Sequence, residues 1–174
     1  ERHDDAILYL HTNLDGAIKL KAMIKQLDLV GKVFAPDQFN YNFGMITERY
    51  MVDLYRASDV LLNTAKSEGF GLPLVEAQMC GLPIAASDYS TTDELLFAGW
   101  KIPTVPDWTI GAESFRARCT IDGVVETLEL AYRNRHNEDL KRQARDGAVA
   151  FDQSRVFEEY WRPALSAIEG LIHG

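Results

Sequence analysis

The chain has 174 residues, of which 47% are hydrophobic and 25% charged, and its formal net charge is −8. This length suits one domain with its own core, and the ordinary composition excludes a disordered or fibrous protein. The acidic balance argues against nucleic acid as a partner, because binding a phosphate backbone requires a basic surface. No segment has the roughly 18 apolar residues of a membrane span or the pattern of a signal peptide, so we expect no membrane insertion.

The cysteine content indicates where the protein works. Cys80 and Cys119 are the two cysteines of the chain. They fit no metal-site spacing and are too few to cross-link a domain of this size. We therefore expect a reducing, cytoplasmic setting and no metal site.

The first third of the chain alternates strand and helix patterns. A short apolar run at residues 6–10 predicts a buried strand, and the helical spacing of apolar residues over 15–29 predicts a helix. A second strand is expected at 32–35 and a loop of turn formers and aromatics at 36–44. A helix over 47–57 then follows, with Thr47 as its N-cap.

The middle of the chain repeats this alternation. Residues 59–65 predict a third buried strand and residues 82–87 a fourth, with a short helix between them. Strands that alternate with helices at this interval are typical of parallel strands joined by crossover helices. We therefore expect the α/β class, with a Rossmann-like, doubly wound parallel sheet and C-terminal helices.

The last third is mainly helical in pattern. Residues 101–108 predict a proline-punctuated connector, and residues 115–120 a weak strand or loop. Amphipathic helices are expected from the apolar periodicity that follows, with Pro163 bending or breaking the last of them. These helices cover residues 122–135, 138–152 and 157–172.

The stretch SEGFGLPLVEAQMCGLPIAAS, residues 67–87, carries the strongest sign of a binding site. In an open α/β sheet, ligands lie outside the carboxyl ends of the strands, where loops lead into helix N-termini. Gly69 and Gly71 allow close approach of the backbone to a ligand, and Pro73 suits a first helical turn. We therefore expect a helix that begins near Leu72, with its positive end as the seat of a diphosphate.

Two carboxylates flank this seat. Glu68 precedes it and Glu76 lies about one turn into the expected helix, so each is placed to accept hydrogen bonds from sugar hydroxyls at one end of a ligand. The alternative is that both are solvated acids that interact favourably with the helix dipole. Spacing alone does not separate the two interpretations, because a glutamate pair eight residues apart arises easily by chance.

Other candidate residues have structural alternatives. His11 follows the first strand on the expected ligand side, but a histidine there is more often satisfied by nearby backbone. Lys66 adds positive charge near the glycine-rich turn, but is more often solvated. The loop aromatics Phe39, Tyr41 and Phe43 are placed to stack on a base, although such aromatics more often pack beneath a loop.

The whole string EGFGLPLVEAQMCGLPIAAS resembles the signature of retaining glycosyltransferases of family 4 (glycosyl transferases group 1), which use the two-domain GT-B fold. The resemblance extends upstream through LYRASDVLLNTA and downstream through SDYSTTDELL. Weaker similarity in ILYLHT and LDLVGKVFAPD brings its extent to residues 6–100. It implies that the chain is the C-terminal, donor-binding domain of such an enzyme.

The resemblance also implies roles for individual residues. Glu68 would contact the transferred sugar near the reaction centre, and Glu76 would bind the ribose hydroxyls of the nucleotide. The donor-binding set comprises Glu68, Gly69, Phe70, Gly71, Leu72 and Glu76, with the backbone amides of Phe70, Gly71 and Leu72 on sugar or diphosphate. The family works without a metal or other cofactor, so the helix dipole and basic side chains stabilise the charge.

Some features depart from the family pattern. Thr64 and Ala65 stand where the family usually has Pro-Ser, and residues 90–92 replace its glycines. The basic pair that grips the diphosphate lies upstream in the family, as does the acceptor-binding domain. We therefore expect residues 1–152 to form the nucleotide-sugar-binding domain. Residues 153–174 would form one or more helices that pack on the missing N-terminal domain.

The implied activity is transfer of a sugar from a UDP, GDP or ADP sugar to an acceptor hydroxyl, with this segment inactive alone. One alternative is a non-catalytic module that binds a nucleotide sugar or a partner, which the departures at residues 64–65 and 90–92 suggest. Another is a sugar-nucleotide epimerase or a phosphorylase on the same architecture, since fold does not decide function. The nucleotide, the sugar and the acceptor stay open.

Overall fold

The structure is a computed structural model that describes residues 3–173. The chain divides into two compact units, Glu1–Met51 and Val52–Gly174. The expected division into residues 1–152 and 153–174 stays a prediction, and its residues 1, 2 and 174 lie outside the described part. No helix among the described residues has both the length and the apolar composition needed to cross a membrane.

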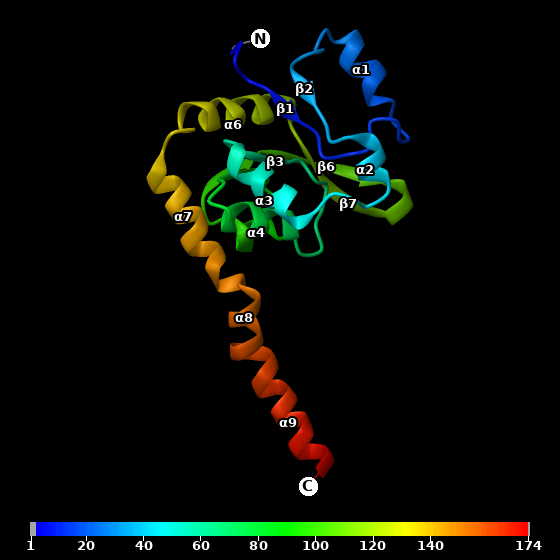
Figure 1. The fold of residues 1–174 in the computed structure, drawn as a ribbon. Coiled ribbons are helices and arrows are strands. Elements are labelled where there is room, and N and C mark those ends of the chain that lie inside the picture. Colours follow the sequence, from blue (N-terminus) through cyan, green and yellow to red (C-terminus); the bar gives the residue numbers. More distant parts are fainter. Residues whose placement is uncertain (1–2, 174) are drawn as a thin grey trace. The chain divides into compact units, whose positions relative to one another are not determined.

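The first unit contains a pair of short parallel strands. Leu8 pairs with Val33 and Tyr9 with Phe34, which confirms the strands expected at 6–10 and 32–35, although each has only two residues. The burial expected of the first strand is not found, because Ile7 and Leu8 are 69% and 42% exposed. Its elements are β1 (Leu8–Tyr9), α1 (Leu20–Gln26), β2 (Val33–Phe34) and α2 (Gln38–Asn42), followed by the start of α3 (Glu48–Ala57) (Figure 1).

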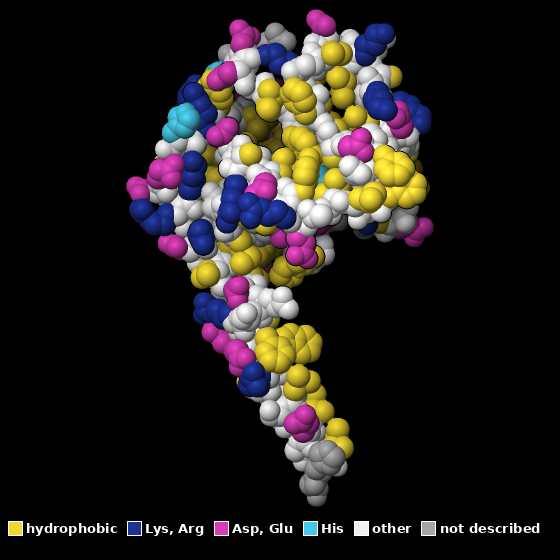
Figure 2. All heavy atoms as spheres, in the orientation of Figure 1, with side chains coloured by type: hydrophobic (Ala, Val, Ile, Leu, Met, Phe, Trp, Pro, Cys, Tyr) yellow, Lys and Arg dark blue, Asp and Glu magenta, His cyan; other side chains and the backbone are white. Residues whose placement is uncertain are grey.

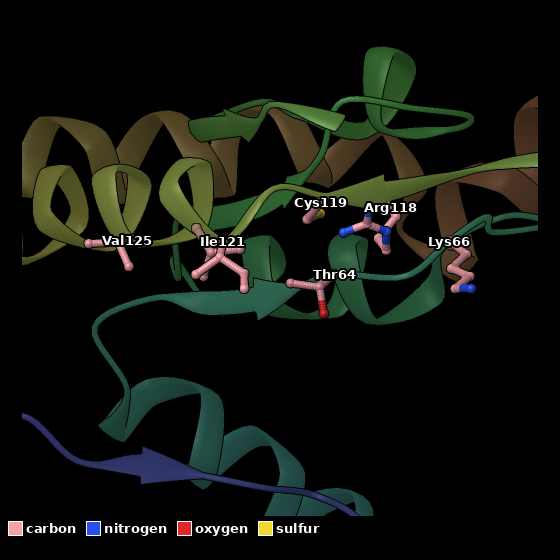
Figure 3. A pocket seen from close by; sticks show the side chains of 7 residues that line it. Thr64, Lys66, Arg118, Cys119, Ile121 and Val125 are labelled. Atoms are coloured by element: carbon pink, nitrogen blue, oxygen red, sulfur yellow. The ribbon is translucent and has the colours of Figure 1, made fainter. Parts of the chain in front are cut away.

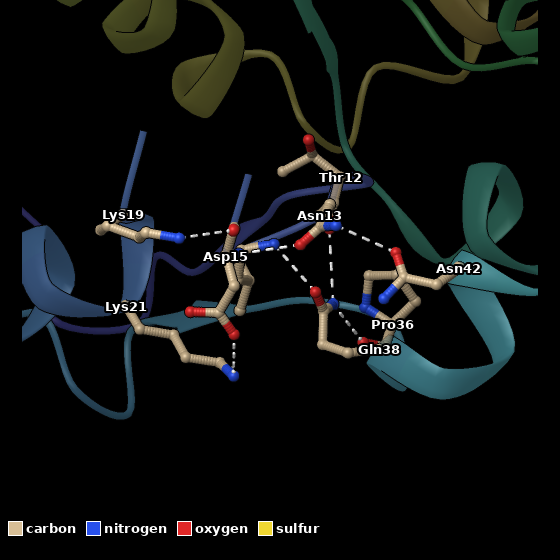
Figure 4. Close-up of polar contacts among 9 residues, drawn as sticks. Thr12, Asn13, Asp15, Lys19, Lys21, Pro36, Gln38 and Asn42 are labelled. Carbon is tan, nitrogen blue, oxygen red and sulfur yellow. Dashed lines mark hydrogen bonds and ion pairs between the residues drawn. The ribbon is translucent and has the colours of Figure 1, made fainter. Parts of the chain in front are cut away.

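The helix expected over 15–29 is shorter than predicted, because a polar turn precedes it. The side-chain oxygen of Asn13 accepts a hydrogen bond from the Asp15 N–H at 2.8 Å, and the carboxylate of Asp15 pairs with Lys21 (Figure 4). The Gln38 amide accepts from the Leu14 N–H at 2.8 Å. These side chains satisfy backbone groups outside a helix, so α1 begins only at Leu20.

The prediction of a loop over 36–44 is wrong in part. Residues 38–42 form α2, because the carboxylate of Asp37 caps it by accepting a hydrogen bond from the Asn40 N–H at 2.9 Å. The expected cap of the next helix is confirmed. The Thr47 hydroxyl accepts from the Tyr50 N–H at 3.2 Å, and α3 begins at Glu48.

The second unit is built on a parallel sheet in the order β3-β4-β5, which confirms the α/β class. The side chains of β4 are all buried, as the apolar run at 82–87 predicts. α4 is the crossover between β3 and β4, and α5 follows β4 along the chain (Figure 1). The elements are β3 (Leu61–Asn63), α4 (Leu72–Met79), β4 (Ile84–Ser87), α5 (Thr92–Leu95) and β5 (Gly99–Ile102).

A buried amide connects α4 to the sheet. Gln78 is 0% exposed, and its Nε2 atom donates to the carbonyl oxygens of Leu74 and Leu95 at 2.9 and 2.7 Å. Its Oε1 atom accepts from the N–H groups of Phe97 and Ala98 at 2.9 and 3.0 Å. All four hydrogen-bonding positions of the amide are therefore used, which fixes α4 against the segment before β5.

The connector expected at 101–108 is instead largely strand. β6 (Thr104–Thr109) and β7 (Ser114–Cys119) form an antiparallel hairpin around the 3₁₀ turn η1 (Ile110–Ala112). Pro106 is tolerated because each strand of a two-stranded sheet is an edge strand. The possible strand at 115–120 is confirmed as β7.

The helices of the last third are confirmed, with differences at their ends. Pro163 does not break the final helix; it lies in the first turn of α9, directly after the π-helical turn η3. Every residue over 157–172 is exposed, and Figure 2 shows apolar side chains along one side of this segment. The elements are α6 (Ile121–Arg133), α7 (Glu138–Ala148), η2 (Val149–Phe151), α8 (Gln153–Val156), η3 (Phe157–Trp161) and α9 (Arg162–His173).

Candidate functional site

The glycine-rich turn leads directly into α4, as predicted. Gly71 is the N-cap and has a left-handed backbone with φ of 94°, and α4 begins at Leu72 with Pro73 in its first turn. A Cβ atom on Gly71 would lie 3.1 Å from Leu74 Cδ1 and 3.2 Å from Thr91 Oγ1. The left-handed torsion therefore favours glycine here, and a Cβ atom would also make tight contacts with its neighbours. The turn places the positive end of the helix beside it.

Glu68 is held by hydrogen bonds from the end of β3 and from the segment that follows β4. Its Oε1 atom accepts a hydrogen bond from Nδ2 of Asn63, the last residue of β3, at 3.3 Å. Its main-chain carbonyl accepts from the hydroxyl of Ser90, which follows β4, at 2.9 Å. Glu68 is half-buried at the carboxyl edge of the parallel sheet, which is where ligands bind in this class of fold.

The orientation of the Asn63 amide is determined by a second hydrogen bond. Its Oδ1 atom accepts from the Ala65 N–H at 2.8 Å. Because Oδ1 is used in this way, the NH₂ group must face Glu68. This bond also stiffens the turn at Thr64 and Ala65, where the proline of the family signature is absent.

Glu76 lies one turn into α4 with its side chain exposed. Its Oε2 atom accepts a hydrogen bond from the hydroxyl of Tyr55 on α3 at 3.1 Å. Tyr55 is buried, and this burial, reinforced by the negative charge of Glu76, raises the pKa of its phenol. A tyrosine phenol is protonated at neutral pH, so Tyr55 is a hydrogen-bond donor there.

Lys66 is already engaged in an ion pair. Its ammonium group contacts the carboxylate of Asp107 on β6, whose Oδ1 atom also lies 3.8 Å from Nε of Arg118 on β7. The hydrogen bond from Lys66 holds the pKa of Asp107 below its usual value. Lys66 thus connects the loop to the hairpin, together with the bond from the Ala117 N–H to its carbonyl at 3.1 Å.

A pocket of about 310 Å³ lies beside this ion pair (Figure 3). Side chains from the loop, from β7 and from the start of α6 reach it, and Figure 3 shows Lys66 and Arg118 at one end and Ile121 and Val125 at the other. Neither Glu68 nor Glu76 lines it. The lining residues are Thr64, Lys66, Arg118, Cys119, Ile121, Val124 and Val125.

The remaining predicted site residues differ in their surroundings. Phe70 and Leu72 are 48% and 62% exposed, and a Cβ atom on Gly69 would meet open space. The Phe70 ring contacts that of Phe151 edge-on, with 5.9 Å between centroids. Four of the donor-binding residues, at positions 69–72, are thus brought together with both glutamates in the second unit.

His11 belongs to the first unit. It is exposed, and its ring makes an edge contact with that of Tyr41 at 5.2 Å between centroids. Phe39 lies on α2 and Phe43 just after it, with 4.6 Å between their ring centroids. Both side chains are exposed. The contacts of these rings therefore lie within the first unit, and their roles in binding stay predictions.

Sequence reasoning missed the partners of both glutamates. Asn63 lies in the apolar run that predicts the third strand, although a polar residue at a strand end is a signal of a ligand edge. Tyr55 carried no such signal, because it is 21 residues from Glu76.

Among residues 3–173, no group of three or more histidine, cysteine or acidic side chains is arranged to hold a metal ion. Metal independence itself stays a prediction.

Residues 15–99 match the family model described as Glycosyl transferases group 1. The D-inositol 3-phosphate glycosyltransferase of Saccharomonospora viridis is 28% identical over 130 residues, which is 69% of this chain and 26% of that protein. The enzyme of the same name from Rhodococcus erythropolis is 50% identical over 38 residues, which is 22% of this chain and 9% of that protein. The chain thus spans about a quarter or less of these relatives, and the matches support a glycosyltransferase.

A solved structure confirms the fold. Sucrose-phosphate synthase from Thermosynechococcus elongatus superposes with a TM-score of 0.64 over 86% of this chain and 34% of that chain. The sequences are only 16% identical, so the likeness concerns the α/β architecture alone.

Proposed function

We propose that this chain is the donor-binding part of a retaining, family 4 glycosyltransferase. It would bind a nucleoside-diphosphate sugar whose sugar passes to an acceptor hydroxyl supplied elsewhere in a longer protein. The match to the Glycosyl transferases group 1 model over residues 15–99 supports the reaction class. The arrangement of Glu68 and Glu76 around the start of α4 carries the assignment of the site.

The chemistry of the site suits a donor of this type. Pro73 has no N–H group and the Leu74 N–H donates to the Gly71 carbonyl at 2.9 Å, so the N–H groups that would face a ligand are those of Leu72 and of the turn before it. The helix dipole adds partial positive charge there, which favours a diphosphate. Carboxylates repel phosphates but accept hydrogen bonds from hydroxyls. Glu68 would therefore take hydroxyls of the transferred sugar, and Glu76 those of the ribose, with the diphosphate between them.

The backbone amides of Phe70, Gly71 and Leu72 would hold the sugar or the diphosphate. As the diphosphate leaves, negative charge grows on its oxygen, and the fixed dipole of α4 stabilises that charge without a metal ion. Lys66 is a weaker candidate for this role than the helix, because Asp107 already neutralises it. His11 is a candidate for hydrogen bonding to the nucleotide.

The C-terminal helix is proposed to pack on the acceptor-binding domain. Five of the exposed apolar residues over 157–172, from η3 into α9, follow one another at intervals of three or four positions, which places these five on one face. A stripe of this kind requires a partner surface. We define the C-terminal stripe as Phe157, Trp161, Leu165, Ile168 and Ile172.

The chain by itself is expected to bind the donor without catalysing transfer, in a cytoplasmic protein. The test is donor-dependent transfer by the full-length protein, with D-inositol 3-phosphate as the first acceptor because the relatives bear its name. We expect Glu68→Gln to lower the transfer rate by about a hundredfold or more. Glu94→Gln, an exposed position on α5, is the matched control. Full activity in Glu68→Gln would contradict the assignment.

A further inference from the structure

Tyr55 is a buried hydrogen-bond donor, and its hydroxyl is directed at an exposed hydrogen-bond acceptor, the carboxylate of Glu76. Its side chain is 8% exposed, whereas Glu76 is exposed on α4. A glutamate on a helix surface ordinarily samples several rotamers, and holding it in one costs conformational entropy. The phenol is fixed by its own packing, so its hydrogen bond to Glu76 Oε2 at 3.1 Å selects one position of the carboxylate before any ligand arrives.

The hydrogen bond leaves most of the carboxylate free. A phenol has one proton to donate, whereas a carboxylate has about four acceptor positions on its two oxygens. Tyr55 uses one position on Oε2, so Oε1 and the other side of Oε2 stay available. Two neighbouring hydroxyls, each donating one hydrogen bond, match this remaining capacity.

The Tyr55 hydroxyl is also an uncharged hydrogen-bond donor, which affects which ligand groups Glu76 can bind. A lysine or arginine in place of Tyr55 would cancel the negative charge of Glu76 and make the position tolerant of phosphate. The Tyr55 phenol is uncharged at neutral pH, as a tyrosine ordinarily is, and burial raises its pKa further. Tyr55 therefore adds no positive charge beside Glu76, and the position favours hydroxyl donors over phosphate.

We propose that Tyr55 is a positioning residue that makes the site selective for ribonucleotides, by orienting Glu76 toward both hydroxyls of the ribose. This inference rests on the proposed function, because that function brings a nucleotide to Glu76. Tyr55 does not touch the ligand itself; it acts through the carboxylate.

The experiment is a calorimetric titration of the chain and its Tyr55→Phe variant with UDP, GDP and ADP, repeated with the 2′,3′-dideoxy counterparts. Phenylalanine keeps the buried ring and removes only the hydroxyl. For the ribonucleotide that binds, we expect Tyr55→Phe to weaken affinity about tenfold, as for loss of a hydrogen bond to a charged group. The affinity for its dideoxy counterpart should not change, so the selectivity ratio falls.

Two controls separate positioning from folding. Tyr160→Phe, at an exposed position on η3, should leave both affinities unchanged. In a Glu76→Ala background, which removes the acceptor of the Tyr55 hydroxyl, adding Tyr55→Phe should have little further effect on ribonucleotide affinity, because the two residues act as one unit.

The outcomes are distinguishable. Equal weakening of ribo- and dideoxynucleotide binding in Tyr55→Phe would mean that the hydroxyl only supports packing, and would overturn the inference. Unchanged affinity for both would overturn it as well, while leaving the proposed function intact. If the unaltered chain binds no nucleoside diphosphate, the proposed function fails first, and the inference fails with it.

Discussion

Nδ2 of Asn63 donates a hydrogen bond to Oε1 of Glu68, while Oδ1 of the same amide accepts one from the Ala65 N–H. The side chain thus performs two separable tasks. It closes the turn after β3, and it presents a neutral donor to the carboxylate expected to contact the transferred sugar.

Replacing Asn63 by aspartate separates these tasks. The introduced carboxylate would still accept the Ala65 N–H, but it cannot donate to Glu68 and repels it. We expect Asn63→Asp to lower the transfer rate of the full-length protein about tenfold or more, with little loss of stability. The rate is measured at saturating donor, and the melting temperature in parallel.

The control for this charge change is Asn137→Asp. Asn137 caps α7 by accepting hydrogen bonds from Asp139 and Leu140 N–H groups, and aspartate is an equally good cap. This variant should keep the full rate. An Asn63→Asp enzyme as fast as the control would show that Asn63 does not position Glu68.

Gln78 should be one of the most sensitive core positions. Gln78→Leu keeps a similar volume but leaves the Leu95 carbonyl and the Phe97 and Ala98 N–H groups without their partner. At about 1 to 3 kcal/mol for each unsatisfied buried group, we expect a loss of about 3 kcal/mol or more in the free energy of unfolding. Urea denaturation measures it. Gln143→Leu, an exposed position on α7, should change it by less than about 0.5 kcal/mol.

The glycine at the start of α4 should not tolerate a side chain. Gly71→Ala forces a residue with a Cβ atom into φ of 94° and against Leu74. We expect a loss of about 1 to 2 kcal/mol in the free energy of unfolding, and weaker nucleotide binding because the turn shifts. Gly111→Ala is the control, since its Cβ atom would meet open space. Equal stability of the two variants in urea denaturation would show that the turn is not constrained in this way.

Some of this site could be predicted from local sequence alone. Gly71, Leu72 and Pro73 encode the turn and the helix start through their own torsional preferences, so the beginning of α4 was predictable. The buried strand β4 was predictable for the same kind of reason, because an uninterrupted apolar run leaves no polar face.

Other features depend on contacts that a local pattern does not contain. The pairing of Tyr55 with Glu76 joins residues on two helices, and only the fold brings them together. The β6–β7 hairpin was hidden because Pro106 argues against a strand unless the strand is known to lie at an edge. The short helix α2 formed within turn-forming residues because Asp37 caps it, which the count of turn formers obscured.

The C-terminal stripe yields a prediction that differs between two forms of the protein. In the 174-residue chain, Leu165 and Ile168 are 45% and 52% exposed, so replacing both by lysine should leave the melting temperature within a few degrees. In the full-length protein, the same double variant should lower the melting temperature and the transfer rate, because it would bury two charges against the acceptor-binding domain. Ser166→Lys, at a different helical position, is the control. Unchanged stability of the full-length double variant would contradict packing of the stripe on another domain.

The most direct test of the donor site is a calorimetric titration of the chain with UDP, GDP and ADP and their common sugar conjugates, compared with Glu76→Ala and the exposed control Glu94→Ala. We predict that one nucleotide and its sugar conjugate bind, that Glu76→Ala weakens this binding at least tenfold, and that Glu94→Ala does not. Absence of binding by every nucleotide, or equal affinity in Glu76→Ala and the unaltered chain, would contradict the assignment of this turn and helix as a donor site.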